Sequence, residues 1–155
     1  MPLLSLPHVL GTTLETLPAD VPYLSADPQA IAAWQGRVGT GGFRVGIVWQ
    51  GNPGFRNDRR RSVPLRHYAP LAAVPGVRLI SLQAIHGLDQ LAGLPAGMTV
   101  ETLGDKITDN PDGMSEIAAA MANLDLVVAS DTAVAHLAGA LGRPVWVALS
   151  DDPDW

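Results

Sequence analysis

Five short, strongly apolar segments recur along the chain, and this pattern restricts the fold more than any other feature. The segments are residues 44–50, 77–83, 98–103, 124–129 and 144–149. Runs of this length with few polar residues are typical of strands that are buried on both faces of a parallel sheet. Helix-like segments lie between them, over residues 65–73, 85–92, 114–123 and 132–141. This alternation predicts right-handed β-α-β units, so we expect an α/β fold with a Rossmann-like parallel sheet flanked by helices.

Length and composition agree with one such domain. The chain has 155 residues, of which 47% are hydrophobic and 16% charged, so it can bury a sizeable core. A formal net charge of −5 argues against a general nucleic-acid binder. The absence of cysteine excludes disulfides, thiolate metal sites and cysteine nucleophiles. No apolar run approaches 18 residues and the N-terminus lacks a basic signal region, so we expect a cytoplasmic protein without a membrane span.

The chain divides into a lead-in and a domain. Residues 1–26 carry four prolines and predict an irregular lead-in or interdomain segment. Asp27 and Pro28 then form a helix start, with Asp27 as N-cap and the helix ending near Gly36. We expect residues 27–155 to form the Rossmann-like domain. It stops a few residues after the last predicted strand without a closing helix, so we expect a domain that is truncated at its C-terminus.

A basic loop follows the first predicted strand. The turn Gly51-Asn52-Pro53-Gly54 leads into a stretch that holds five of the ten basic residues of the chain within eleven positions. These five are Arg56, Arg59, Arg60, Arg61 and Arg66. Local positive charge at the carboxyl end of a strand favours a site for phosphate or another anion. The alternative is a solvated surface loop, and the charge pattern alone leaves both open.

A second candidate site follows the fourth predicted strand. Ser130 or Asp131 can cap the helix that begins there, and small residues at 132, 133 and 135 let a ligand approach its first turn. The amides of that turn and the helix dipole form a ready site for a diphosphate. His136 lies about one turn into the helix and could donate a hydrogen bond to the same group. The alternative is a capped core helix whose histidine is satisfied locally.

Several familiar sites are missing from the sequence. There is no phosphate-binding G-x-x-x-x-G-K-[ST] loop, no G-x-G-x-x-G after a strand, no H-E-x-x-H and no G-x-S-x-G. The missing glycine fingerprint makes an NAD-type oxidoreductase the least favoured interpretation. Asp152-Pro153-Asp154 has the form of a D-x-D metal motif, but at the end of the chain we expect no metal there. His8, His67 and His86 are isolated, and we interpret them as structural or exposed.

Two segments carry a resemblance to a known family. Residues 45–65, VGIVWQGNPGFRNDRRRSVPL, and 125–149, DLVVASDTAVAHLAGALGRPVWVAL, resemble the C-terminal half of glycosyltransferase family 9, the heptosyltransferases. The sequence is most similar to bacterial proteins that place such a domain behind tetratricopeptide repeats, in which stretches like residues 5–24 precede the domain. The resemblance implies one half of a GT-B fold. It also implies a nucleotide-diphosphate-sugar donor as substrate and no metal or other cofactor.

The resemblance also implies roles for individual residues. Asp131 would face the donor sugar, residues 132–134 would offer amides or a hydroxyl to the diphosphate, and His136 would support them. Arg61 stands where heptosyltransferases carry a diphosphate-binding lysine, and Gln83 is placed near the nucleoside. Asn52, in the turn after the first predicted strand, completes the set. The candidate donor-binding residues are Asn52, Arg61, Gln83, Asp131, Thr132, Ala133, Val134 and His136.

The sequence departs from the family pattern at two of these positions. Heptosyltransferases usually have glycine where this chain has Ala133, which tightens the approach to the backbone. Arg61 in place of lysine keeps the charge but replaces a point donor with a planar fork. The acceptor-binding half, which would supply the catalytic base, has no counterpart among the 155 residues.

We therefore expect the donor-binding half of a GT-B glycosyltransferase, inactive in glycosyl transfer on its own. Its partners would be the nucleotide-sugar donor and, in the same polypeptide, the missing N-terminal half or tetratricopeptide repeats. The alternative is a non-catalytic nucleotide-binding or scaffold module of a tetratricopeptide-repeat protein. Exposed apolar surface on such a module would also favour self-association.

Overall fold

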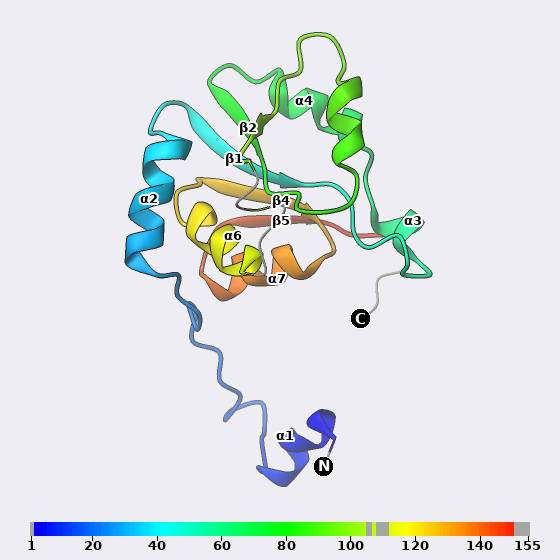
Figure 1. The fold of residues 1–155 in the computed structure, drawn as a ribbon. Coiled ribbons are helices and arrows are strands. Elements are labelled where there is room, and N and C mark those ends of the chain that lie inside the picture. Colours follow the sequence, from blue (N-terminus) through cyan, green and yellow to red (C-terminus); the bar gives the residue numbers. More distant parts are fainter. Residues whose placement is uncertain (1, 105–106, 108–111, 151–155) are drawn as a thin grey trace.

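A twisted sheet of five parallel strands forms the centre of the molecule (Figure 1). The computed structural model describes residues 2–104, 107 and 112–150. The strands are β1 (Phe43–Val48), β2 (Val77–Ser81), β3 (Glu101–Thr102), β4 (Leu126–Ser130) and β5 (Val145–Ala148). They lie in the order β3-β2-β1-β4-β5, and every pair of neighbours is parallel. The predicted α/β, Rossmann-like sheet is confirmed.

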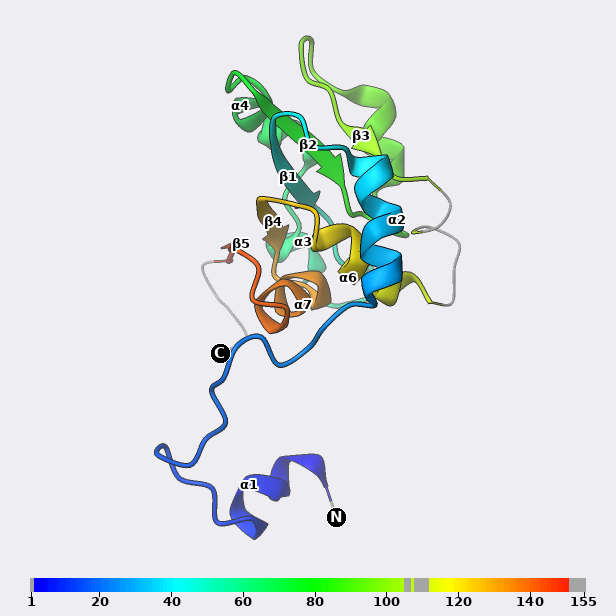
Figure 2. The same ribbon diagram turned by 90° about the vertical axis from the view of Figure 1, so that its left-hand side faces the viewer.

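Helices cover both faces of this sheet (Figure 2). One face packs against α2 (Pro28–Val38), α6 (Gly113–Met121) and α7 (Ala133–Ala140). The other packs against the 3₁₀ turns η2 (Leu65–Tyr68) and η3 (Leu88–Gly93), with the short helix α4 (Ala69–Ala72) between them in the chain. Two hydrophobic clusters result, one on each face, as expected for strands that are apolar on both sides.

Strand β1 shows how the sequence produces this double core. Val45 and Ile47 belong to the cluster under η2, whereas Val48 belongs to the cluster under α6 and α7. Gly46 faces this second cluster without a side chain, and a Cβ built there would lie 2.8 Å from Leu82 Cδ1. The glycine therefore provides space for neighbouring leucines to close over the strand.

The predicted helix after the lead-in is present and is longer than expected. Asp27 caps α2, since its carboxylate accepts hydrogen bonds from Gln29 N at 3.3 Å and Ala30 N at 3.2 Å. The helix continues past Gly36 to Val38 and ends where Gly39 takes a positive φ of 72°. An aspartate cap at one end and a left-handed glycine at the other fix the limits of this helix.

Other predicted elements are shorter in the structure. The helix expected over residues 65–73 is a 3₁₀ turn followed by α4, because Pro70 lacks the amide that a continuous helix needs at that position. The helix expected over 85–92 is η3, which begins after Gly87 with φ of 77°. The strand expected over 98–103 has only two paired residues. A one-turn helix, α3 (Asp58–Arg61), lies in the basic loop where no helix was predicted.

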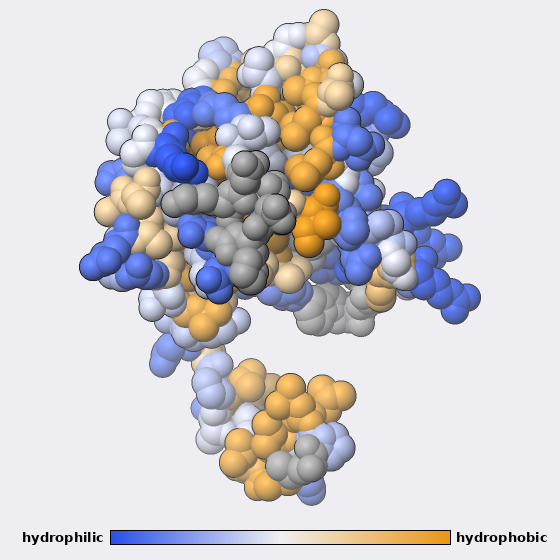
Figure 3. Space-filling model, in the orientation of Figure 1, coloured by the Kyte–Doolittle hydropathy of each residue, from blue (hydrophilic) through white to orange (hydrophobic). Residues whose placement is uncertain are grey.

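The lead-in forms an arm that projects from the body, and Figure 3 shows a largely hydrophobic surface on it. It is irregular except for η1 (Leu3–Ser5) and α1 (Leu6–Val9). Nine large apolar side chains on it are exposed: Leu3, Leu4, Val9, Leu10, Leu14, Leu17, Val21, Tyr23 and Leu24. The arm joins the body where Tyr23 N and Leu24 N both donate to the carbonyl of Ala140. None of the described helices has the length and hydrophobicity needed to cross a bilayer.

Candidate anion-binding site at the switch point of the sheet

The strand order places the two candidate segments side by side. The chain leaves β1 toward β2 on one side, and it leaves β4 toward β5 on the other side. The topological switch point therefore lies between the carboxyl ends of β1 and β4, where ligands bind in open parallel sheets. Residues 50–62 follow β1 and residues 131–134 follow β4. The sequence predicted both segments as anion sites, and the fold brings them to one place.

A cavity of about 310 Å³ opens at this switch point. Six of the eight candidate donor-binding residues line it: Asn52, Arg61, Gln83, Thr132, Ala133 and Val134. Asp131 and His136 are not among its lining residues. Ile85, Met114 and Ile117 add an apolar wall from the β2 loop and α6. One end of the cavity is thus polar and the other apolar, which suits a ligand with both kinds of surface.

The N-terminus of α7 forms part of the polar end. Thr132 occupies the N-cap position with extended backbone, but its side chain makes no cap hydrogen bond. Its hydroxyl instead donates to the carbonyl of Ser130 at 3.2 Å. The amides of Ala133 and Val134, which begin the helix, have no carbonyl of their own helix to bond. An uncapped helix start of this kind offers its amides and the positive end of its dipole to an anion.

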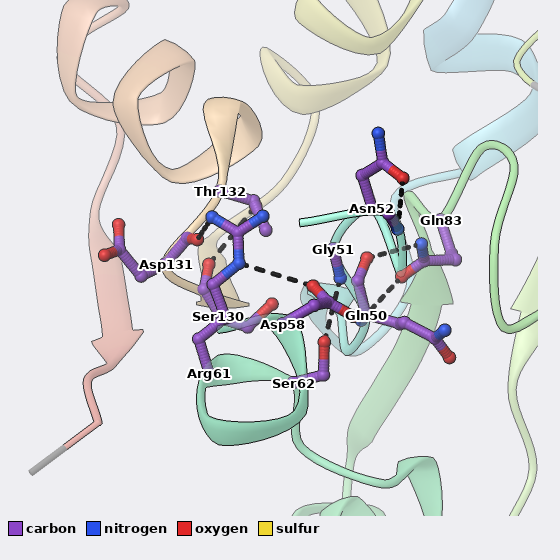
Figure 4. Close-up of polar contacts among 11 residues, drawn as sticks. Gln50, Gly51, Asn52, Asp58, Arg61, Ser62, Gln83, Ser130, Asp131 and Thr132 are labelled. Atoms are coloured by element: carbon purple, nitrogen blue, oxygen red, sulfur yellow. Dashed lines mark hydrogen bonds and ion pairs between the residues drawn. The ribbon is translucent and has the colours of Figure 1, made fainter. Parts of the chain in front are cut away.

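Arg61 connects the two loops of the site (Figure 4). Its Nε donates to Asp58 Oδ1 at 3.3 Å, and its Nη1 donates to the carbonyl of Asp131 at 3.1 Å. Its guanidinium carbon also lies 4.5 Å from the centre of the Phe55 ring. The arginine is therefore held next to the start of α7 by three contacts, and part of its fork is already engaged by the protein.

Gln83 and Asn52 use their side chains to shape the loop after β1. The Gln83 carbonyl oxygen accepts from Trp49 N and Gln50 N, both at 3.1 Å, and its amide nitrogen donates to Gln50 O at 2.8 Å. The Asn52 side chain accepts from Gly54 N at 2.9 Å. Gln83 thus forms a wall of the cavity, with its polar atoms holding the backbone. Its predicted place near a nucleoside stays a prediction.

Asp131 and His136 form a pair beside the start of α7. His136 Nε2 lies 3.9 Å from Asp131 Oδ1, a distance at which a protonated imidazole forms an ion pair. The histidine side chain is 55% exposed and that of Asp131 is 15% exposed. Their predicted contacts with a donor sugar and diphosphate stay predictions.

The structure adds residues that the sequence analysis did not single out. Asp58 is buried at 5% exposure beside Arg61. The sequence feature that could have indicated this pair is an acid three positions before Arg61 within a run of arginines. Ser62 accepts from Gly51 N at 3.0 Å and closes the base of the loop. His86, interpreted above as isolated, lines the cavity. Met114 and Ile117 carry no motif, so only the fold reveals their place.

A second hollow of about 480 Å³ lies along the same loop, lined in part by Phe55, Arg56 and Arg59. It includes no residue of α7, so it lacks the helix start that makes the first cavity a candidate anion site. We therefore assign the candidate site to the cavity at the switch point. Among the described residues, no three His, Asp or Glu side chains lie close enough together to hold a metal ion. Residues 152–154, the D-x-D motif, lie outside the described residues.

Comparisons with known proteins show which families and folds the chain resembles. Residues 111–149, which include α6, β4, α7 and β5, match the family model of glycosyltransferase family 9 (heptosyltransferase). Protein FlbA of Caulobacter vibrioides is 28% identical over an alignment of 149 residues that covers 94% of this chain. The aligned segment is 25% of FlbA, so the chain spans about a quarter of the length of this relative.

A solved structure shows the same fold. The chain is similar to the ADP-heptose LPS heptosyltransferase II of E. coli, with a TM-score of 0.60 at 18% sequence identity. The match covers 88% of this chain and 42% of the heptosyltransferase. Residues 111–149 are thus similar to glycosyltransferase family 9, and the chain shares the Rossmann-like fold of this part of the heptosyltransferase.

Proposed function

We propose that this chain is the donor-binding half of a GT-B glycosyltransferase and that it holds a nucleotide-diphosphate sugar in the cavity at the switch point. The observation that carries the proposal is the uncapped start of α7, which opens into the same cavity as Arg61. The match of residues 111–149 to glycosyltransferase family 9 supports a nucleotide sugar as the class of ligand. No metal or other cofactor is part of the proposal.

In this proposal the polar end of the cavity binds the diphosphate. The amides of Ala133 and Val134, and the N–H bonds of Arg61 that no described residue accepts, stabilise the charge that grows on the departing nucleoside diphosphate. Asp131 and His136, beside the same helix start, face the donor sugar and support the diphosphate. The apolar wall of Ile85, Met114 and Ile117 receives the nucleoside.

The catalytic base is proposed to come from the N-terminal half of the GT-B fold. A sugar transfer needs a base and an acceptor held against the donor, and the cavity described above supplies donor contacts only. We therefore expect the chain by itself to bind the donor and to transfer nothing. Its proposed partners are that half or tetratricopeptide repeats in the same polypeptide, and its proposed location is the cytoplasm.

An amide-shift titration tests the proposal directly. The labelled chain is titrated with ADP, UDP and GDP, and then with their sugar conjugates. We expect saturable shifts at residues 51–62 and 131–136 for at least one nucleotide. Flat spectra for all of them at millimolar concentration would reject the donor site.

The exposed arm favours a second candidate, a scaffold module. Leu4 and Leu14 are 94% and 88% exposed, and they belong to an arm that carries nine exposed large apolar side chains. In this case the arm makes the chain self-associate or dock on a neighbour. Sedimentation of the chain and of Leu4→Ser/Leu14→Ser would then show self-association that the double variant loses, while nucleotides leave it unchanged.

A further inference from the structure

The Arg61 guanidinium is fixed on three sides. Asp58 holds Nε, the carbonyl of Asp131 holds Nη1, and the Phe55 ring covers the group at 4.5 Å. The Arg61 side chain is only 21% exposed. A long flexible cation is thereby restricted to one orientation, although it belongs to a surface loop.

Asp58 is the unusual member of this group. It begins α3, a helix of a single turn, and it is 5% exposed, which is costly for a carboxylate. The carboxylate's ion pair in the described part of the chain is with Arg61. Since Arg61 in turn reaches across the switch point to Asp131 O, the buried carboxylate ties the β1 loop to the start of α7.

Gly51 shows which way the rest of the guanidinium faces. A Cβ built on Gly51 would lie 2.4 Å from Asp58 Oδ1 and 2.8 Å from Arg61 Nη2. Gly51 has no positive φ, so it is the space and not the backbone that requires glycine here. The Nη2 group therefore lies against Gly51, at the wall of the cavity that Thr132 and Ala133 also line.

We propose that Asp58 is a positioning residue that sets the selectivity of this site for a diphosphate over a monophosphate. It fixes Arg61 so that Nη2 and the α7 amides face one cavity, and two phosphates can then be bound by two separate sets of donors. The inference rests on the proposed function. It goes further in assigning the selectivity to a buried acid that does not itself touch the ligand.

Electrostatics alone makes the opposite prediction, and this gives the test its power. Removing an acid near an anion site makes the potential more positive and should tighten anion binding. If Asp58 positions Arg61, however, its removal should weaken anion binding. We expect Asp58→Asn to weaken ADP binding about 10-fold, the loss of one charge-assisted hydrogen bond, and to weaken AMP binding less than about 2-fold. Asp89→Asn, the same charge change at an exposed residue of η3, is the matched control and should leave both unchanged.

The experiment is calorimetric titration of the full chain and its variants with ADP and with AMP. In an Arg61→Ala background, Asp58→Asn should cause no further loss, because nothing remains to be positioned. Asp58→Glu is the second variant, since it keeps the charge and displaces the carboxylate, and it should also lower the ratio of ADP to AMP affinity. Thermal unfolding of each variant confirms that it is folded.

The outcomes separate the two proposals. Equal or tighter ADP binding by folded Asp58→Asn or Asp58→Glu would overturn the role of Asp58 and leave the donor site intact. A wild-type chain that binds neither ADP nor AMP would overturn the donor site, and the selectivity with it. The Arg61 Nε–H resonance reports on the pair without any nucleotide. It should be slow to exchange in the wild type and fast in Asp58→Asn, and equal rates in both would contradict the positioning.

Discussion

The two ends of the parallel sheet differ in how completely their polar groups are paired. At the amino ends of the strands, two arginines are saturated by carboxylates. Arg44 at the start of β1 forms a two-pronged pair with Asp125, at 2.9 Å and 2.8 Å, and also donates its backbone amide to that carboxylate. Arg78 on β2 pairs in the same way with Glu101 on β3, at 2.7 Å and 2.6 Å.

At the carboxyl ends, donors are left open. The α7 start has no side-chain cap, although Thr132 stands in the capping position. Helix α2 differs, because Asp27 accepts from two amides of its first turn, whereas α6 and α7 both begin without a side-chain cap hydrogen bond. This difference is what the proposed function requires, with the amino ends serving stability and the carboxyl ends holding a ligand.

The largest effect is expected from making the open end resemble the closed one. Thr132→Asp would give α7 a carboxylate cap like that of α2, stabilising the chain by about 0.5–1 kcal/mol. The same carboxylate would occupy the amides and repel a diphosphate, so ADP affinity should fall about 100-fold. Amide-shift titration and thermal unfolding measure the two effects. Thr132→Ser is the control. It should change the ADP affinity by no more than about 2-fold and leave the thermal stability unchanged.

The reverse experiment removes saturation at the amino ends. Asp125→Ala deletes three hydrogen bonds and leaves Arg44 without its carboxylate partner. Both side chains are partly exposed, at 20% and 29%, so we expect a loss of about 2 kcal/mol in the free energy of unfolding. ADP affinity should stay the same, since this pair lies at the opposite end of the sheet. Denaturant unfolding measures the loss of stability, and titration of the same sample with ADP measures the affinity. A change in ADP affinity would contradict the division between the two ends.

Acid should weaken the closed end. The hydrogen bonds from Arg44 lower the pKa of Asp125, and those from Arg78 lower the pKa of Glu101, in both cases against a smaller opposing effect of burial. The unfolded chain then binds more protons than the folded one. The stabilisation is therefore present above the unfolded pKa of about 4 and is lost as the pH falls through the folded values. Thermal unfolding between about pH 6 and pH 3 measures this effect. The difference in stability between wild type and Asp125→Asn should become smaller as the pH falls.

The smallest effect concerns the backbone beneath the open end. The Tyr68 hydroxyl donates to Val48 O at 3.0 Å, and burial raises the pKa of Tyr68 to about 12. Tyr68→Phe should cost about 1 kcal/mol of stability and leave ADP affinity unchanged. Because the folded pKa is raised, this stabilisation is complete below about pH 10 and declines toward pH 12. Denaturant unfolding at neutral and alkaline pH measures this. The free energy of unfolding of the wild type should decline at alkaline pH by an amount that Tyr68→Phe does not show.

The strands, and the loops that follow β1 and β4, could be predicted because their signals are local. Continuous apolar runs mark β1, β2, β4 and β5, and turn residues mark the loops that follow β1 and β4. Strand order is a long-range property, but the rule for parallel sheets was enough to bring both loops to one end.

The parts that were missed depend on contacts between distant residues. The reach of Arg61 to Asp131 spans 70 positions and no periodicity encodes it, so the local pairing of Asp58 with Arg61 gains its meaning only in the fold. Met114 lines the cavity only because α6 packs beside α7. The short 3₁₀ turns replaced predicted helices because Pro70 and Gly87 override the apolar spacing around them.

The attachment of the arm determines where mechanical load enters the domain. Tyr23 N and Leu24 N both donate to Ala140 O, the last residue of α7. Helix α7 has eight residues and is therefore about 12 Å long, so the anchorage lies one short, stiff rod away from the amides of Ala133 and Val134. Tension or torque applied to the arm acts first on this rod and only then on the sheet.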